Sequence, residues 1–407
     1  MKTKKLISLF IISFALMIQY HSNAQIANKI ELTEDNQLLG LGVQHNFQSE
    51  ILAEERPLII STPVGYEDTN ADYPVLYLLD GLQNIKHVVA TSEFLAETGL
   101  IPPMIIVGIK STDRAKDFTP SKAGENTYGA VEGAGIPQSG GAPEFLKFLE
   151  KELIPFIEEN YRTHPYRILE GHSFGGLFST YSLMKEHGLF DAYIIQAPAL
   201  WWNNEEMIVK AEAFFKSNPD LNKTVYFGIG GNDGWGMRQE LKRYVEVIKT
   251  NTPAGFRWKH EVVANEDHDQ ARLLLNYNGL RFIYSDLEMD EITAKSFDQI
   301  EFLIGEKKLM DRYGPMTRRP AMEYVVLYSA LLEQDRTIEA ISVLKRATEA
   351  YPNYVGLLTN LARQYEKVDQ IENAIQTYRT AIKISEKYKL GYADGYFNEI
   401  HRLEKVK

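Results

Sequence analysis

The stretch RILEGHSFGGL, residues 167–177, decides the fold of this chain. Residues 167–170 end a short apolar strand, residues 171–175 have the pattern Gly-x-Ser-x-Gly, and the residues from Leu177 to about Glu186 predict a helix. We expect glycine at 171 and 175 because a Cβ there would collide with the neighbouring strand and helix. A strand, this turn and a helix in succession predict a strained serine, Ser173, whose Oγ is lifted clear of a sheet.

This succession is the nucleophile elbow of the α/β-hydrolase fold, so Ser173 is the predicted nucleophile. The alternative is a glycine-rich turn whose serine only caps the helix. From about Asn28 to Asp286, short apolar runs alternate with helical patterns, which predicts βαβ units and a mostly parallel central sheet. The expected strands are 56–62, 73–79, 104–109, 166–170, 192–196, 224–229 and 256–263, and the expected helices include 143–161, 203–217 and 237–250.

Length and composition limit the class of protein. A chain of 407 residues suggests more than one domain, and its apolar and charged fractions are those of a soluble globular protein. The formal charge of −11 argues against a nucleic-acid partner, which calls for a basic surface. The sequence has no cysteine, which excludes disulfides and thiolate metal sites.

Residues 1–24 have the pattern of a cleaved signal peptide. Lys2, Lys4 and Lys5 precede an apolar run from Leu6 to Ile18, and Ser22-Asn23-Ala24 forms a small-x-small cleavage site. The apolar run is shorter than the ~20 residues of a membrane-spanning helix, so no membrane anchor is expected. The expected location is the periplasm or the outside of a bacterium.

The pattern becomes continuously helical from about Met316, with an internal repeat. Three positions have counterparts 34 residues later in the chain: Ala340 corresponds to Ala374, Leu344 to Tyr378 and Ala347 to Ala381. A 34-residue period with small residues where two helices cross is typical of tetratricopeptide repeats, and an ordinary helical bundle is the alternative. The expected organisation is a signal peptide at 1–24, an α/β-hydrolase domain at 25–290, a helical linker at 291–315 and tetratricopeptide-like repeats at 316–407.

An activated serine needs a base, and usually a carboxylate that orients it. In α/β-hydrolases both follow the serine, the acid first. His268 lies in a polar loop directly after the last expected strand, which makes it the predicted base, whereas His260 falls within an alternating strand pattern. Asp233 lies in the loop after the strand 224–229 and is the first candidate for the acid. Glu240 is a second candidate, and a Ser–His dyad without an acid is a third alternative.

Other residues are candidates for oxyanion and substrate binding. The backbone N–H of Phe174, directly after the serine, and that of Leu82, after the strand 73–79, are predicted to form the oxyanion hole. Trp201 and Trp202 are candidates for stacking on an acyl group, with packing of a lid as the alternative. Arg114 and Asp117 are expected to pair and hold their own loop. The histidines and carboxylates near Ser173 lack metal-ligand spacing, so neither metal nor cofactor is expected.

The chain resembles the putative-esterase family of α/β-hydrolases, which includes esterase D, siderophore esterases, feruloyl esterases and mycolyltransferases. The resemblance covers about 260 residues and is carried by five ordered segments: 73–81, 107–120, 171–176, 197–202 and 267–269. The segment 197–202 resembles the periplasmic siderophore-esterase branch, which acts on catecholate trilactones and can work with a Ser–His dyad. The siderophore esterases lack a tetratricopeptide tail, so the tail argues against assigning that specificity.

The sequence therefore predicts a secreted or periplasmic serine esterase that acts on a siderophore-type ester or on a feruloyl or acetyl ester of a polysaccharide. The expected partners are this small-molecule or glycan-linked ester and a protein bound by the helical repeats. Two alternatives stay open. One is acyl transfer to a sugar or lipid by the same fold, and the other is a protein-interaction scaffold that uses the repeats.

Overall fold

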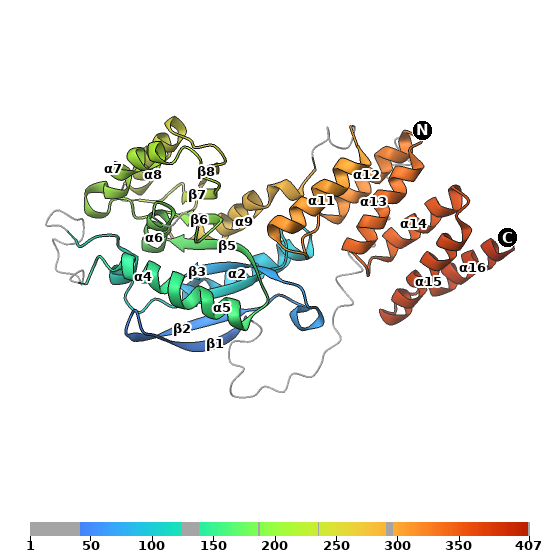
Figure 1. The fold of residues 1–407 in the computed structure, drawn as a ribbon, viewed down its shortest axis with the longest axis horizontal. Coiled ribbons are helices and arrows are strands. Elements are labelled where there is room, and N and C mark those ends of the chain that lie inside the picture. The colour runs from blue at the N-terminus through green and yellow to red at the C-terminus, as the bar shows by residue number, and fades with distance from the viewer. Residues whose placement is uncertain (1–40, 124–137, 186–187, 235, 290–295, 406–407) are drawn as a thin grey trace. The chain divides into compact units, whose positions relative to one another are not determined.

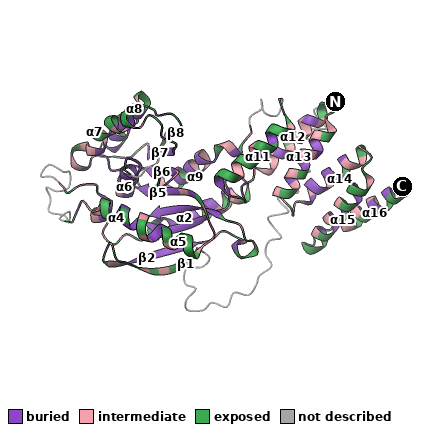
Figure 2. Cartoon of the chain, in the orientation of Figure 1, coloured by how far each residue is buried: buried purple, intermediate pink, exposed green. Residues whose placement is uncertain are grey.

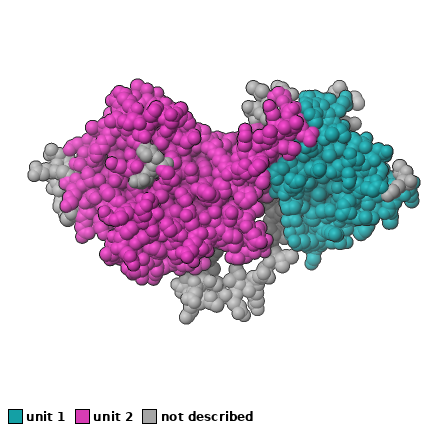
Figure 3. All heavy atoms as spheres, in the orientation of Figure 1, with its two compact units in different colours: residues 1–39, 331–407 teal, residues 40–330 magenta. Residues whose placement is uncertain are grey.

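The computed structural model describes residues 41–123, 138–185, 188–234, 236–289 and 296–405. The predicted signal peptide at 1–24 lies outside these ranges, as do parts of the expected loop 119–141 and linker 291–315. Contacts within the chain divide the described residues into two compact units, 40–330 and 331–407 (Figure 3). No helix in the described ranges is both long and apolar enough to cross a membrane.

The first unit is built on an eight-stranded sheet with the order β1-β2-β4-β3-β5-β6-β7-β8 (Figure 1). Strands β3 to β8 are parallel to one another, and β2 pairs antiparallel with β1 and β4. This mostly parallel sheet with helices confirms the predicted α/β-hydrolase fold. The strands are β1 (Val43–Ser49), β2 (Glu54–Ser61), β3 (Tyr73–Leu79), β4 (Ile105–Ile109), β5 (Thr163–His172), β6 (Ala192–Gln196), β7 (Thr224–Gly230) and β8 (Arg257–Val263).

Helices cover both faces of the sheet, so the central strands are buried throughout (Figure 2). The helices of this unit are α2 (Gly81–Glu97), α3 (Arg114–Phe118), α4 (Ala142–Phe148), α5 (Ile154–Asn160), α6 (Phe174–Leu183), α7 (Trp202–Ser217), α8 (Met237–Thr250), α9 (Arg272–Ile283) and α11 (Gln299–Tyr313). A π-helical segment (Leu149–Leu153) joins α4 to α5, and short 3₁₀ turns form at Tyr66–Asp68 and Ser285–Leu287.

The alternation of side chains along each strand separates two cores. Tyr77 on β3 and Tyr193 on β6 pack with side chains of α4 to α8 in one large apolar cluster. Ile194, the next residue on β6, faces α9 instead, because a Cβ at Gly279 of α9 would lie 2.9 Å from its Cγ2. Helices α2 and α9 pack against each other on this second face. Because helices cover both faces of the sheet, the side chains on both sides of these strands are buried. This explains why the strands are continuous apolar runs in the sequence.

The second unit is helical. Helix α12 (Ala321–Glu333) belongs to the first unit up to residue 330, and only its end belongs to the second. The other helices of the second unit are α13 (Thr337–Ala350), α14 (Val355–Lys367), α15 (Ile371–Lys387) and α16 (Ala393–Glu404), and each packs on the next. Helices α13 and α15 begin 34 residues apart, and the repeated positions are buried in both: Ala340, Leu344 and Ala347 in α13, and Ala374, Tyr378 and Ala381 in α15. The described residues of the second unit are therefore all in helices and the turns between them, as expected for the chain from about Met316 onward.

Candidate active site

Ser173 lies between the end of β5 and the start of α6, with φ 60° and ψ −116°. A non-glycine residue in such a conformation costs about 1–3 kcal/mol, so the surrounding structure must hold it there. Two backbone hydrogen bonds do so: Ser173 N–H donates to Gln196 O at 3.0 Å, and Ala199 N–H donates to Ser173 O at 3.1 Å. Ser173 is thereby fixed to the end of the neighbouring strand β6.

Two glycines make room for this turn. A Cβ at Gly171 would lie 2.7 Å from Ser179 Oγ, and one at Gly176 would lie 2.8 Å from Gln196 O. A Cβ at Gly175 would meet Leu79 Cβ at 3.4 Å, which is ordinary contact. The crowding expected at 171 is confirmed and that expected at 175 is wrong. Gly176, for which none was expected, is crowded because α6 presses its third residue against the end of β6.

The loops after β7 and β8 bring Asp233 and His268 together. Asp233 Oδ2 lies 2.8 Å from His268 Nδ1, and the Asp233 side chain is fully buried while that of His268 is 23% exposed. A carboxylate at Nδ1 fixes the proton there, which leaves Nε2 free to accept a proton. The loops also bond through their backbones, Asn232 N–H to Glu266 O at 2.8 Å. Of the two carboxylates that the sequence suggests as acid, Asp233 makes this contact.

Glu240 lies instead on α8, where burial raises the pKa of its carboxyl to about 7.

The sequence analysis predicts no role for His172, but its side chain contacts His268. Its Nε2–H donates to the backbone carbonyl of His268 at 2.8 Å, and the two ring centroids are 4.4 Å apart. Burial, and then the nearby charge of His268, lowers the pKa of His172 to about 3, so its ring is neutral. This contact places His268 beside the residue that precedes Ser173.

The two residues expected to form the oxyanion hole each lie in the first turn of a helix. Phe174 is the first residue of α6, and Leu82 is the second residue of α2. Backbone N–H groups in a first turn lack an acceptor within the helix and carry its positive dipole end, which suits them to bind a negative oxygen. Gly81 lets α2 begin here, since a Cβ at this position would lie 2.5 Å from the backbone of Gly108.

The expected pairing of Arg114 with Asp117 is wrong. Arg114 binds Asp80 with two hydrogen bonds of 2.7 and 3.0 Å, and its guanidinium lies 5.9 Å from the centre of the Phe174 ring. Asp117 instead pairs with the buried Arg56 at 2.8 Å. Arg114 therefore connects the end of β3 to the residue after the serine, and it brings a positive charge to the site.

A second arginine reaches the same region from the start of α9. Arg272, the first residue of α9, donates from Nη1 to Asn84 Oδ1 at 3.1 Å, two residues beyond Leu82. The positive charges of Arg272 and Arg114 both act on His172 and lower its pKa further. Both arginines are paired with carboxylates: Arg114 with the buried Asp80, and Arg272 with the exposed Asp269 at 3.4 Å.

The two tryptophans differ in exposure. Trp202 is fully buried, and its indole N–H donates to Ser121 O at 3.2 Å. Trp201 is partly exposed, and its ring lies 5.7 Å from that of Phe174. Trp202 is therefore buried in the core, so its candidacy for stacking on a substrate is wrong and the alternative of packing holds for it. Trp201 remains the candidate.

The buried carboxyl group of Glu170 connects the elements next to the Ser173 turn. Glu170 on β5 accepts hydrogen bonds from Gln196 Nε2 at 2.6 Å and Asn276 Nδ2 at 2.8 Å. Gln196 is the residue whose carbonyl holds Ser173 N–H. Burial raises the pKa of Glu170 to about 8, so its carboxyl is mostly protonated at neutral pH. Glu170 thus joins β5, β6 and α9 behind the serine.

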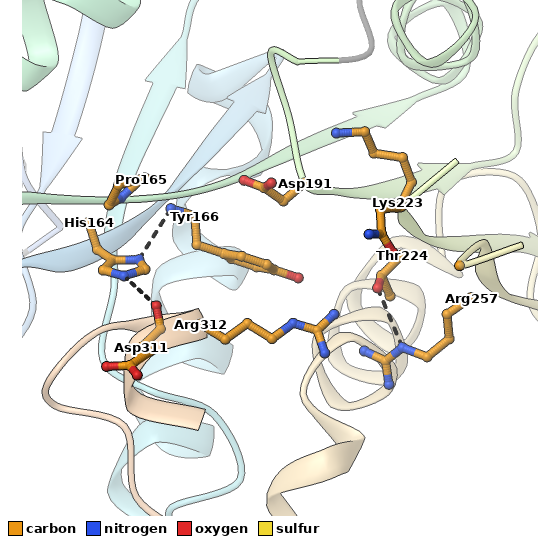
Figure 4. Close-up of a pocket in the computed structure, with 11 residues that line it drawn as sticks. His164, Pro165, Tyr166, Asp191, Lys223, Thr224, Arg257, Asp311 and Arg312 are labelled. Carbon is orange, nitrogen blue, oxygen red and sulfur yellow. Dashed lines mark hydrogen bonds between the residues drawn. The ribbon is translucent and has the colours of Figure 1, made fainter. Parts of the chain in front are cut away.

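A cavity of about 600 Å³ lies at the opposite edge of the sheet (Figure 4). His164, near the start of β5, and Arg312, at the end of α11, are among the residues that line it. His164 donates to the carbonyl of Asp311 at 3.2 Å, which attaches α11 to the sheet. Because Ser173 follows the other end of β5, about 30 Å of strand separates this cavity from the serine, and it has no part in the chemistry there.

A serine at a nucleophile elbow near a His–Asp pair is the arrangement of a serine hydrolase with the α/β-hydrolase fold. Comparison with known proteins gives the family. Residues 49–271 match the family described as putative esterase. The chain belongs to this family and is an ester hydrolase.

Named relatives share this part of the chain. The ferri-bacillibactin esterase BesA of Bacillus subtilis is 28% identical over 228 residues, which cover 52% of this chain and 79% of BesA. A siderophore enterobactin esterase of Emericella nidulans is 32% identical over 189 residues, or 41% of this chain and 60% of the relative. The crystal structure of an IroE-like serine hydrolase from Shewanella oneidensis is similar with a TM-score of 0.62 and 26% identity, covering 75% of this chain and 98% of the hydrolase.

The crowding at the elbow predicts different effects for two adjacent glycines. Gly176→Ala should lower the free energy of unfolding by about 2–3 kcal/mol, because its Cβ displaces backbone. Gly175→Ala, the matched control, should change it by no more than about 1 kcal/mol, since an alanine fits and favours the helix. Urea unfolding measures both, and equal effects would contradict this account of the turn.

Glu170 predicts a pH-dependent stability. The folded protein holds the Glu170 proton up to a pKa of about 8, whereas the unfolded chain releases it near 4.5. The contribution of the Glu170 proton to the unfolding free energy is therefore complete below pH 4.5. It is lost as the pH rises toward 8, at about 1.4 kcal/mol per pH unit. Glu170→Gln should flatten the decline in unfolding free energy over this range, while Glu212→Gln on the surface should not. An unchanged slope in Glu170→Gln would refute the assignment.

Proposed function

We propose that this protein is a secreted or periplasmic serine esterase that cleaves its substrate through an acyl-enzyme, with Ser173 as nucleophile, His268 as base and Asp233 as the acid that orients it. The observation that carries the proposal is the 2.8 Å contact between Asp233 and His268, on loops adjacent to the strained Ser173. Export is proposed from the signal-peptide pattern of residues 1–24.

In the proposed mechanism, His268 Nε2 takes the proton of Ser173 Oγ as the oxygen attacks the ester carbonyl. The negative oxygen that develops is bound by the N–H groups of Phe174 and Leu82. His268, now charged and stabilised by Asp233, gives its proton to the departing alkoxide, which leaves an acyl group on Ser173. Water, deprotonated by His268, then attacks this acyl group and regenerates the serine.

The surroundings of Ser173 favour an anionic ester with an aromatic group. Arg272, whose partner Asp269 is exposed and 3.4 Å away, supplies positive charge, and the partly exposed rings of Phe174 and Trp201 supply a surface for stacking. A siderophore-type ester fits this description, and the named relatives are siderophore esterases. A feruloyl ester of a polysaccharide has the aromatic group and is the next substrate to test, followed by acetyl esters.

We also propose that residues 316–407 form tetratricopeptide-like repeats, because the positions that recur every 34 residues are buried alike in α13 and α15. Such repeats commonly present a surface to a protein partner.

The assignment of the acid and base predicts a graded loss of activity. Ser173→Ala and His268→Ala should lower kcat for p-nitrophenyl acetate by at least about 10³-fold, and Asp233→Asn by about 10²–10⁴-fold. Glu240→Gln is the matched control and should stay within about three-fold of wild type. If Glu240→Gln is as defective as His268→Ala while Asp233→Asn is active, the acid is assigned wrongly. A folded wild-type chain without turnover on this ester and on siderophore and feruloyl esters would contradict the esterase proposal.

The positive charge predicts discrimination between substrates. Arg272→Gln should raise KM for p-nitrophenyl hemisuccinate, whose acyl group is anionic, by about five-fold to ten-fold, and should leave KM for neutral p-nitrophenyl acetate unchanged. Arg243→Gln, which removes an arginine from α8, is the control and should affect neither. Equal changes for the two esters in Arg272→Gln would show that its charge does not select substrates.

A further inference from the structure

The loop that carries His268 is attached to the loop after β7 by the contact of His268 with Asp233 at 2.8 Å. It begins after β8 and is attached on one side by Asn232 N–H to Glu266 O at 2.8 Å. Within the loop, Asp267 Oδ1 accepts from the N–H groups of Asp269 and Gln270. These bonds shape the loop but do not tie residue 268 to the strand that carries the serine.

His172 provides that connection. It is the last residue of β5 and is 7% exposed, and its Nε2 lies 2.8 Å from the His268 carbonyl oxygen. A carbonyl oxygen accepts hydrogen bonds only, so this nitrogen carries the proton. The backbone on either side is fixed as well: Ser173 N–H is bound to Gln196 O, and His172 O accepts from Arg114 Nη2 at 3.5 Å. The donor therefore projects from a rigid strand end.

We infer that His172 is a positioning residue for the reaction: its Nε2–H bond to the carbonyl of His268 holds the base loop against β5 and keeps the His268 ring directed at Ser173. The inference rests on the proposed function, in which His268 is the base. One hydrogen bond from the last residue of β5 thus joins the contact with Asp233 in holding His268 in place.

The neutral state of His172 matters for the same reason. Its ring lies 4.4 Å from that of His268, which becomes an imidazolium when it takes the serine proton. A second positive charge at that distance would oppose this step. Arg114 and Arg272 already face His172 with positive charge, and Asp233 faces His268 with negative charge. A neutral donor between them fixes the loop without lowering the basicity of His268.

The test compares two replacements of His172. His172→Phe keeps a ring and removes the N–H, and His172→Gln keeps an N–H donor at similar reach. The readouts are the second-order rate of Ser173 labelling by a fluorophosphonate probe, its pH profile, and kcat and KM for p-nitrophenyl acetate. His172→Phe should lower the labelling rate and kcat about ten-fold or more, with KM within about two-fold, and His172→Gln should recover most of the loss. His260→Phe, which removes a histidine of β8, should match wild type.

Labelling of His172→Phe at the wild-type rate, or a His172→Gln variant as slow as His172→Phe, would overturn the inference. If His172→Phe does not fold, ¹⁵N NMR of the wild-type imidazole decides: the inference requires an Nε2–H tautomer of His172 that stays neutral from pH 8 to pH 5. A titration of His172 in that range, or the Nδ1–H tautomer, would overturn it. Failure of the wild-type protein to be labelled at all, in a chain that hydrolyses no ester, would instead overturn the proposed function.

Discussion

The turn between β5 and α6 is the constraint on which the rest of the site depends. Ser173 adopts φ 60° and ψ −116° only because Gly171 and Gly176 have no Cβ and because the backbone of β6 holds Ser173 on both sides. The strain costs about 1–3 kcal/mol, which a large two-sided core can offset. The same turn starts α6, so the N–H of Phe174 lies in the first turn of a helix, directly after Ser173. One local conformation therefore positions both the proposed nucleophile and one proposed oxyanion donor.

The parallel order of β3, β5, β6, β7 and β8 brings the other groups to the same edge of the sheet. Leu82 lies in the first turn of α2, directly after β3, and the loops after β7 and β8 carry Asp233 and His268, which hydrogen bonds between these two loops hold together. Buried polar groups behind the edge add a second layer. Glu170 links three elements below Ser173, and His172 links the serine strand to the base loop. The site is thus held from within the domain rather than by exposed loop contacts.

The sequence predicts the central strands well because both of their faces are buried and they read as unbroken apolar runs. It misses β1, whose exposed and half-buried positions at the sheet edge give a weak pattern, and α2, whose buried face includes the polar Asn84, Thr91 and Ser92. The proposed serine, base and acid are predicted from chain order and loop position. Contacts between distant segments could not be predicted in this way. Arg114, for example, pairs with Asp80, 34 residues away, and not with its neighbour Asp117. The contact of His172 with His268 could not be predicted either, because the pattern Gly-x-Ser-x-Gly allows any residue at position 172 and the partner lies in a distant loop.

Mass spectrometry of the protein during turnover shows whether Ser173 carries the acyl group. The protein is mixed with p-nitrophenyl acetate, quenched with acid within the first turnovers and digested. The account predicts an added acetyl group on the peptide that contains Ser173, reduced when His268 is replaced by alanine and absent in Ser173→Ala. Ester hydrolysis that proceeds with no acetyl group on Ser173, or with the group on another residue, would contradict it.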